Sequence, residues 1–416
     1  MKNFIIFLLF LMIGSQTFAQ QPNCFTSEKM QEQLATDLGL AARRADIEHF
    51  TQKWIEEHGT EQNREVITIP VVVHVVYKTA SQNISDEQIY SQLDVLNEDY
   101  RLLNADAASI PSAWNSVKAD VEIEFCLAVR DPNGFPTNGI TRTETVTTSW
   151  NGSDNVKLTS QGGKNAWPAG QYLNIWVCNI GSGLLGYAYQ PGITAALDGL
   201  VIGYAYFGRG VPGVSATYNK GRTATHEIGH YFNLDHPWGV NEANANCNQD
   251  DAVSDTPKQE EPNYGCQTFP HITCSNGPNG DMFNNFMDYG RDNCLLLFTN
   301  GQKERMLAAL NGPRASLKTS LGCVPTNVGI EEAPLAGQFV VYPNPANDLL
   351  TIKSESAILS EADIRIVTLT GIEVMRQNGL NLSNATLSVG HLPVGIYLLE
   401  VSAASEKAIS RLHIIR

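Results

Sequence analysis

The stretch HEIGHYFNLDH, residues 226–236, gathers the residue types that bind metals and move protons. His226 and His230 are four residues apart, so on a helix they share one face and both imidazoles can reach one zinc ion. Glu227 follows the first histidine, and a carboxylate there can take a proton from a water whose pKa zinc has lowered. The spacing predicts a catalytic zinc site on a helix. Core histidines satisfied by hydrogen bonds are the alternative.

A catalytic zinc site needs a third protein ligand and one open position. His236 lies six residues after His230, and a straight helix would carry it away from the metal. Asn233 lies between them, and after glycine asparagine is the residue that most readily takes a positive φ. We therefore expect the chain to turn after Phe232 and to bring His236 back to the metal.

These residues resemble the long metzincin signature H-E-x-x-H-x-x-G-x-x-H, with Asn233 in place of the usual glycine. The segment NFMDY supplies Met287 and Tyr289 as a candidate methionine turn with its following tyrosine. Together with DAVSDTP after the motif, the pattern is similar to that of the pappalysin family, over residues 66–323. The resemblance implies an α/β, metzincin-like catalytic domain, with a twisted mixed sheet, an active-site helix and a loop-rich C-terminal subdomain.

The family resemblance also implies a reaction, the hydrolysis of peptide bonds in protein or peptide substrates by a secreted zinc endopeptidase. The zinc ligands that it implies are His226, His230 and His236. Glu227 is expected to be the general base, and Tyr289 to hydrogen-bond the oxyanion or else to pack behind the site. Met287 is expected as a soft floor under the imidazoles. A secreted adhesin with a structural zinc, closed by a fourth protein ligand, is the alternative.

The loop after the motif carries four of the eight cysteines, and sequence alone allows three pairings of these four. The resemblance implies the pairs Cys247 with Cys274 and Cys266 with Cys294. It also implies a structural calcium site in this loop, which is rich in the oxygen ligands that calcium prefers. Its implied ligands are the side chains of Asp251 and Glu260 and the carbonyls of Val253 and Thr256, with Asp250 and Asp255 as alternatives. A merely solvated acidic loop is the other interpretation.

Cys24 lies near the N-terminus, away from these cysteines. A thiolate is a good zinc ligand, and at the open position it would displace the catalytic water. Bacterial pappalysins are similar in carrying such a cysteine in a short pro-segment, which implies a latent precursor. The alternative is a disulfide from Cys24 to Cys126, Cys178 or Cys323, and the pairing of those three stays open. Arg64 is a candidate point for self-cleavage.

Two further features bear on substrate binding. The segment GLLGYAYQP, residues 183–191, is a candidate edge strand to which a substrate backbone can add, although an ordinary sheet edge has the same pattern. Asp288 is a candidate specificity residue, because bacterial pappalysins prefer a basic residue just after the cut. An acidic loop residue that is only solvated is the alternative.

The elements that must position these residues alternate between strands and helices. The segment VITIPVVVHVVYKT predicts a strand buried on both faces. The next segment predicts a helix with a capping box of Ser85 and Gln88, and residues 299–310 predict a closing helix. Further strands are predicted in VEIEFCLAV, YLNIWVCNI and GLVIGYAYF. This order is typical of an α/β fold.

The two ends of the chain indicate export. Lys2, the apolar stretch FIIFLLFLMIG and the small-residue site TFA predict a signal peptide. The apolar run is too short for a comfortable span, so we expect no stable membrane insertion. The net charge of −15 disfavours nucleic acid as a partner.

The C-terminal strands predict a small all-β sandwich that resembles the sorting domain of the type IX secretion system. The alternative is a carbohydrate- or protein-binding sandwich. The resemblance implies the type IX machinery as a partner and export through the periplasm to the cell surface or beyond. The expected divisions are a signal peptide (1–19), a pro-segment (20–64), the catalytic domain (65–323), a linker (324–337) and the sorting domain (338–416).

Overall fold

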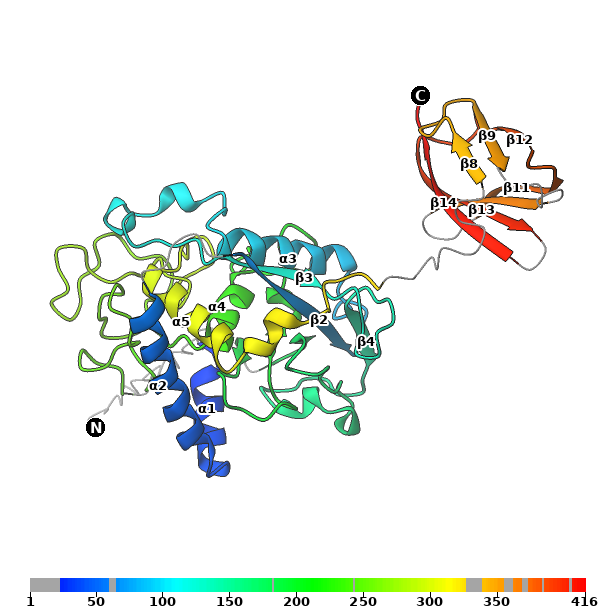
Figure 1. Ribbon diagram of the computed structural model, residues 1–416. Coiled ribbons are helices and arrows are strands. Elements are labelled where there is room, and N and C mark those ends of the chain that lie inside the picture. Colours follow the sequence, from blue (N-terminus) through cyan, green and yellow to red (C-terminus); the bar gives the residue numbers. More distant parts are fainter. Residues whose placement is uncertain are drawn as a thin grey trace, which may run out of the picture. The chain divides into compact units, whose positions relative to one another are not determined.

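The computed structural model divides the chain into two compact units, Met1–Pro325 and Thr326–Arg416, each with its own core (Figure 1). The residues that the structure describes are 23–59, 65–181, 183–241, 244–326, 339–354, 362–368, 373–383, 385–403 and 406–416. The expected signal peptide and Arg64 lie outside them. Among the described residues, no helix is both long enough and apolar enough to cross a bilayer.

The first unit is built on a seven-stranded sheet with the order β1-β6-β7-β5-β2-β3, in which β4 also pairs with β2. The strands are β1 (Asn23–Cys24), β2 (Ile67–Tyr77), β3 (Ile123–Leu127), β4 (Ile140–Glu144), β5 (Leu173–Cys178), β6 (Leu184–Ala188) and β7 (Leu200–Gly203). Only β6 and β7 pair antiparallel, so the sheet is mixed, as expected. Strands β1 and β4 are additions that the sequence pattern does not predict.

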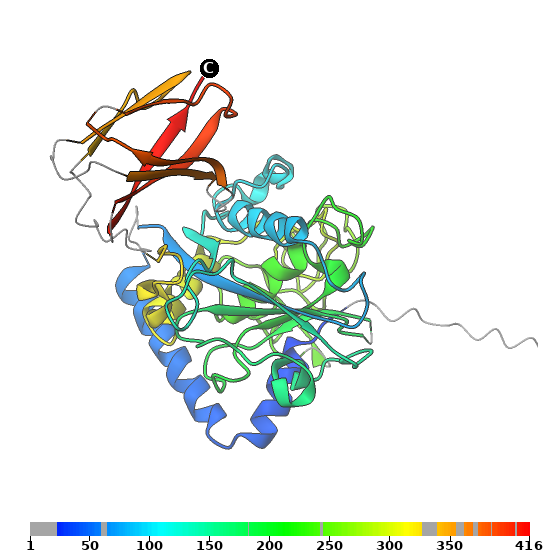
Figure 2. The ribbon, with the colours of Figure 1, turned by 90° about the vertical axis from the view of Figure 1, so that its right-hand side faces the viewer.

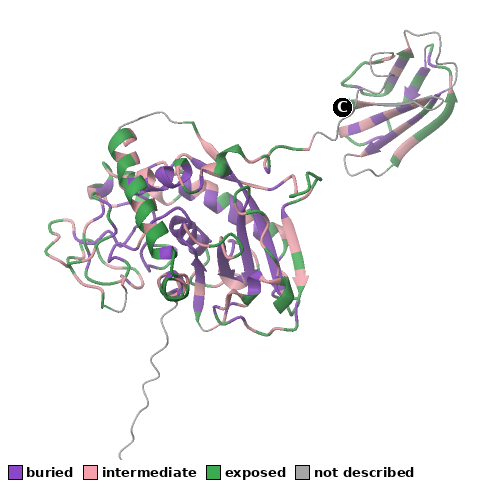
Figure 3. Ribbon diagram, turned by 60° about the horizontal axis from the view of Figure 1, so that its bottom comes forward, coloured by how far each residue is buried: buried purple, intermediate pink, exposed green. Residues whose placement is uncertain are grey.

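Strand β2 is buried on both faces, because most of its residues are apolar and β-branched. Val73 and Val75 contribute to the core on one face of the sheet, and Val76 contributes to the core on the other. All three are at most 1 % exposed, which confirms the prediction from the continuous apolar run. Figure 3 shows the same concentration of buried residues in the sheet and in the helix beside it.

Three helices share the core on the first of these faces: α3 (Asp86–Tyr100), α4 (Arg222–Tyr231) and α5 (Asn300–Asn311). Figure 2 shows α3 and α4 on the same side of the strands. The apolar stripe of α3 and the buried residues of α4 therefore fix the active-site helix against the sheet.

The ends of α3 and α5 differ in how they are capped. Ser85 accepts a hydrogen bond from the backbone of Gln88 at 3.2 Å, as predicted. The Gln88 side chain donates to the carbonyls of Tyr204 and Phe207 instead, so the expected reciprocal box is only half formed. A complete capping box forms at Thr299, where α5 begins.

Two helices precede β2: α1 (Thr26–Thr36) and α2 (Leu40–His58). Helix α1 packs beside β6, and α2 packs beside α5 (Figure 1). Glu48 of α2 forms a paired interaction with Arg305 of α5, with distances of 2.9 and 2.8 Å. Residues 23–59, the described part of the expected pro-segment, are thus folded and pack against the rest of the first unit.

The chain between α4 and α5 is mostly irregular and is crossed by two disulfides, Cys247–Cys274 and Cys266–Cys294. These are the pairs that the family resemblance implies. A third disulfide joins Cys126 of β3 to Cys323 near the end of the unit. Cys178 keeps a buried thiol, which answers the pairing question that the sequence leaves open.

The second unit has two small antiparallel sheets around one core. Its strands are β8 (Phe339–Tyr342), β9 (Leu349–Ser354), β10 (Ala362–Thr368), β11 (Glu373–Leu380), β12 (Ala385–Ser388), β13 (Gly395–Ala403) and β14 (Glu406–Ile414). Alternate residues such as Ile364, Ile366, Leu399 and Val401 are at most 1 % exposed. This is the all-β sandwich that the alternation predicts.

Candidate active site

Helix α4 and the turn that ends it bring three imidazoles together. His226 and His230 lie on adjacent turns of α4, and the helix stops at Phe232. Asn233 has a φ of +74°, and the Leu234 N–H donates to the Gly229 carbonyl at 3.0 Å. This is the helix ending in which a left-handed residue reverses the chain. It returns His236 to the other two histidines, as the sequence predicts.

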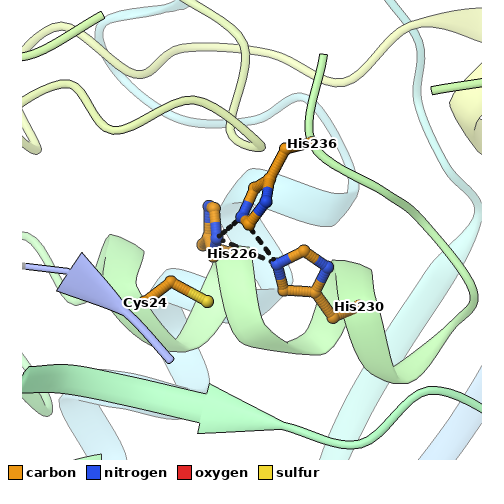
Figure 4. A group of neighbouring side chains, drawn as sticks. All are labelled: Cys24, His226, His230 and His236. Atoms are coloured by element: carbon orange, nitrogen blue, oxygen red, sulfur yellow. Dashed lines mark hydrogen bonds between the residues drawn. The ribbon is translucent and has the colours of Figure 1, made fainter. Parts of the chain in front are cut away.

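The three Nε2 atoms face one another in a tight triangle (Figure 4). His226 and His230 are 3.1 Å apart, His230 and His236 are 3.0 Å apart, and His226 and His236 are 3.2 Å apart. All three side chains are at most 6 % exposed. Burial and the two neighbouring imidazoles hold the pKa of His230 well below its usual value.

The tautomers of two of these histidines follow from their other ring nitrogens. Nδ1 of His226 lies 2.8 Å from the Phe286 carbonyl, and Nδ1 of His230 lies 2.8 Å from the Leu234 carbonyl. A carbonyl only accepts, so both Nδ1 atoms carry the proton and both Nε2 atoms present lone pairs. Facing lone pairs repel unless a cation lies between them. Tetrahedral zinc with bonds of about 2.0–2.1 Å separates its nitrogens by about 3.3 Å, so this donor set fits zinc.

A group of aromatic rings orients His236. Its imidazole stacks on Trp238, with ring centroids 4.5 Å apart and planes 9° apart. The Tyr289 ring is inclined by 79° to His236 and by 74° to Trp238, with ring centroids 4.9 and 4.8 Å away. Trp238 is not among the site residues that the sequence predicts, although it lies only two positions after the third histidine.

Met287 packs against α4 at its only glycine. The Met287 side chain is fully buried, and a Cβ on Gly229 would lie 2.3 Å from its sulfur. Gly229 is the residue just before His230, so the thioether lies against the helix turn that carries both imidazoles. The carbonyl of the preceding residue, Phe286, accepts a hydrogen bond from His226 Nδ1. The turn therefore supports the site by packing and by fixing a tautomer.

The N-terminal segment reaches into the site. Strand β1 pairs parallel with β6, with Cys24 opposite Gly186. The Cys24 sulfur and a ligand atom of each of the three histidines all lie within 4.8 Å of one another. In Figure 4 the Cys24 side chain points from β1 towards the histidines. A thiolate in this place is suited to the same cation.

The same segment covers Glu227. Its Oε2 accepts a hydrogen bond from Thr26 Oγ1 at 3.0 Å and lies 3.5 Å from the Cys24 sulfur. Gly186 of β6 lies so close that a Cβ there would be 3.1 Å from Glu227 Cγ. The Tyr289 hydroxyl lies 3.5 Å from the Cys24 carbonyl. Glu227 and Tyr289 therefore lie on the side of the histidines that β1 occupies. No pattern in the sequence predicts the contact of Thr26 with Glu227.

Asp288 lies beside this group, in the wall of a cavity of about 30 Å³ that Cys24 and Glu227 also line. Its carboxylate accepts from the Gln259 amide at 3.0 Å and from the Asn263 backbone at 2.9 Å. Burial raises the pKa of Asp288 to about 6 against these hydrogen bonds. The carboxylate is thus held in place within the loop-rich part of the unit.

The candidate calcium loop is partly assembled. Thr256 Oγ1 donates to the Asp251 carboxylate at 2.7 Å and lies 2.9 Å from the Val253 carbonyl. Burial raises the pKa of Asp251 to about 8. The Glu260 side chain is exposed. The two alternative ligands have other partners: Asp250 pairs with Lys258 at 2.9 Å and Asp255 accepts from the backbone of Gly301 at 2.9 Å.

Comparison with known proteins agrees with this geometry. Residues 157–311 match the pregnancy-associated plasma protein-A family, and residues 340–415 match the secretion system C-terminal sorting domain. An extracellular metalloprotease of Colletotrichum graminicola is 30 % identical over 294 residues, covering 67 % of this chain and 91 % of that protein. One of Arthroderma gypseum is 33 % identical, covering 58 % and 71 %.

Two solved structures from Tannerella forsythia are also similar. Mature mirolysin in complex with a cleaved peptide is 48 % identical, with a TM-score of 0.61, covering 64 % of this chain and 100 % of that one. A promirolysin mutant is 43 % identical, with a TM-score of 0.66, covering 73 % and 98 %.

The mixed sheet, the active-site helix and the family match define a zinc metalloendopeptidase of the metzincin type. More narrowly, the chain belongs to the pappalysin family and carries a C-terminal type IX sorting domain. The sorting domain and the extracellular relatives mark it as a secreted or cell-surface protein.

Proposed function

We propose that the protein is a latent endopeptidase whose zinc ligands are His226, His230 and His236 and whose general base is Glu227. The observation that carries the proposal is the triangle of Nε2 atoms, 3.0–3.2 Å apart, with two Nδ1 protons committed to carbonyls. Zinc bound there would lower the pKa of water and polarise the scissile carbonyl.

The chain's own residues supply the proton transfers. Glu227 takes a proton from the attacking water and passes it to the nitrogen of the leaving amine, so the carboxylate is regenerated at the end of the cycle. The Tyr289 hydroxyl donates a hydrogen bond to the oxygen that becomes negative in the transition state. Met287 and Phe286 keep the imidazoles in place, and Trp238 holds His236 by stacking.

Substrate binds along β6 after the pro-segment has left. In the precursor this edge is taken by β1, and Phe25 N donates to the Gly186 carbonyl at 3.0 Å. A substrate backbone in its place would use the same edge for main-chain hydrogen bonds, which give affinity without sequence choice. Asp288, in the wall of the adjoining cavity, favours a basic residue just after the cleaved bond.

Latency rests on Cys24 and its neighbours. We propose that the Cys24 thiolate is the fourth zinc ligand of the precursor and excludes the catalytic water. Thr26 meanwhile engages the Glu227 carboxylate. Because Cys24 belongs to the pro-segment (20–64), its removal opens the fourth position of the catalytic domain (65–323). The opening of the fourth position distinguishes an enzyme from an adhesin, because in an adhesin a ligand from the domain itself would fill that position on a structural zinc.

The remaining assignments concern stability and export. We propose a structural calcium ion held by Asp251, Glu260 and the carbonyls of Val253 and Thr256, supported by the burial of Asp251. The signal peptide (1–19) directs the chain to the periplasm. After the linker (324–337), the sorting domain (338–416) engages the type IX machinery. Cleavage near Arg64 releases the mature enzyme.

The test of the catalytic proposal is cleavage of casein by the mature wild type and by Glu227→Ala, with zinc content measured for both. We expect both proteins to hold one zinc and only the wild type to cleave, with activity lost on chelation and regained with zinc. Equal cleavage by a zinc-loaded Glu227→Ala protein would disprove the role of Glu227. A wild type that holds zinc but cleaves nothing would favour the adhesin.

A further inference from the structure

The carboxylate of Asp154, near strand β6, forms an ion pair with Lys29 of the proposed pro-segment. Asp154 begins the short 3-10 helix η3 (Asp154–Lys157), and its Oδ2 lies 3.1 Å from Lys29 Nζ of α1. The Lys29 ammonium also lies 5.7 Å from the centre of the Tyr187 ring. The Lys29 side chain is 7 % exposed. Burial lowers the pKa of Lys29, but hydrogen bonds and charge from Glu32 and Asp154 more than offset this, so Lys29 stays charged.

The rest of this arrangement belongs to the catalytic unit. Tyr189 donates to Asp154 Oδ2 at 2.6 Å, and Tyr187 donates to Oδ1 at 3.0 Å. Lys157, which is fully buried, lies 3.3 Å from Oδ1 and donates to the Leu197 carbonyl at 2.7 Å. Asp154 is therefore held in place by residues that remain when α1 leaves. Its Oδ2 is the oxygen that meets the pro-segment.

The position of Asp154 along β6 relates it to the bond that is cleaved. Gly186 lies against Glu227, and Tyr187 is the next residue of β6, followed two positions later by Tyr189. A substrate strand that pairs antiparallel, the commoner and slightly more stable arrangement, runs against the direction of β6. The residues before its cleaved bond then pass Tyr187 and Tyr189.

We propose that Asp154 and the Tyr187 ring form a subsite for a lysine or arginine side chain of the substrate, on the amino-terminal side of the cleaved bond. In the precursor Lys29 occupies this subsite. A carboxylate and an aromatic face together suit a cation on a long stem, which can reach over the strand edge. The inference rests on the proposed function, since it assumes that substrate takes the β6 edge.

The test uses N-terminally acetylated peptides, so that no α-amino group competes as a cation. Each of the four positions before the cleaved bond carries lysine in one peptide and uncharged norleucine in its partner. For the mature, zinc-loaded wild type we expect kcat/KM to be about tenfold higher with lysine at one of these positions, because lysine adds an ion pair and a cation–π contact that norleucine lacks. In Asp154→Asn this ratio should fall to about one.

Asp120→Asn is the matched control, because it also removes a carboxylate that pairs with a cation, Arg101, away from β6. It should keep the ratio of the wild type. A ratio near one in the wild type overturns the proposal without any variant. This outcome does not depend on the folding of Asp154→Asn, in which Lys157 would be buried beside a neutral group. A preference that survives in a folded Asp154→Asn protein overturns it too.

Binding to the mature Glu227→Ala protein, measured by calorimetry, separates this subsite from the catalytic proposal. The lysine peptide should bind about tenfold more tightly than its norleucine partner. If the wild type cleaves nothing while this difference is present, the proposed function fails and the subsite stands. If the wild type cleaves both peptides and Glu227→Ala binds them equally, the subsite alone fails.

Discussion

The Asn233 side chain accepts a hydrogen bond of 2.6 Å from Arg44, so the residue that turns the chain towards the third histidine also contacts the proposed pro-segment. The side-chain amide nitrogen of Asn233 lies 3.4 Å from Thr51 Oγ1, and its backbone carbonyl accepts from Arg305 Nη2 at 3.4 Å. Arg305 in turn pairs with Glu48. Helix α2 therefore packs against the turn that brings His236 to the other two histidines.

Asn233→Gly should separate these two roles. Glycine takes a positive φ at no steric cost, so the zinc content and activity of the mature enzyme should be retained. The contacts to Arg44 and Thr51 disappear, so we expect the precursor to mature faster, as followed by gel electrophoresis. Asn233→Val should instead lower zinc content and activity, because a β-branched residue at this φ costs about 1–2 kcal/mol and displaces His236. Unchanged maturation of Asn233→Gly would mean that the amide contacts do not hold α2.

The ion pair between Glu48 and Arg305 should make pro-segment docking sensitive to acid. Burial raises the pKa of Glu48, but hydrogen bonding and charge from Arg305 outweigh it and bring the pKa to about 2, from 4.5. A lowered folded pKa stabilises the docked state above pH 4.5, and this stability is lost as pH falls towards about 2.

The difference in stability between the wild-type and Glu48→Gln precursors measures the contribution of this ion pair. Since the Glu48 side chain is 38 % exposed, solvent screening reduces the energy that its pKa shift implies. We expect the ion pair to stabilise the precursor by about 1–2 kcal/mol at neutral pH. The Tm difference between the two precursors should be constant above pH 4.5 and shrink below it. A difference that does not change with pH would contradict the role of this carboxylate.

Gly229→Ala should destabilise the site although alanine favours helix. The new Cβ would lie 2.3 Å from the Met287 sulfur, in a place where the side chain has no exposed surface. Overpacking costs about 1–3 kcal/mol, against a gain of up to about 1 kcal/mol in helix propensity. We expect a lower Tm and weaker zinc retention. The same substitution in a Met287→Ala background should cost less, and equal costs in both backgrounds would rule out this contact.

Cys24→Ala should accelerate maturation, because the precursor loses the thiolate proposed to close the zinc site. Cys178→Ala is the matched control, since it removes the other buried thiol, on β5. Precursor conversion should be faster only for Cys24→Ala, and its uncleaved precursor should already hydrolyse a short peptide. Equal conversion rates for the three proteins would argue against the switch.

A calcium chelator should lower the Tm of the zinc-loaded enzyme if the loop binds calcium. Binding at 100 times Kd stabilises the folded state by about 2.7 kcal/mol. Asp251→Asn should abolish the response to calcium. Asp250→Asn, which removes an exposed carboxylate paired with Lys258, should keep it. Absence of any calcium-dependent shift in the wild type would leave the loop as a disulfide-held structure.

The sequence alone determined the features that depend on short separations along the chain. The four-residue spacing of His226 and His230 and the turn at Asn233 are set by local backbone geometry, and the structure contains both. The continuous apolar run of β2 and the alternation of the C-terminal strands likewise required no partner to be recognised. The family resemblance added the two loop disulfides.

Only the tertiary structure decided what meets across long separations. It brought the Phe286 carbonyl to His226 and set Thr26 on Glu227. It joined Cys126 to Cys323 and left Cys178 reduced. None of these follows from spacing, because a contact between distant residues depends on the order of strands in the sheet. That order placed β6 next to β1 of the N-terminal segment, and β6 also packs against the helix that carries His226 and His230.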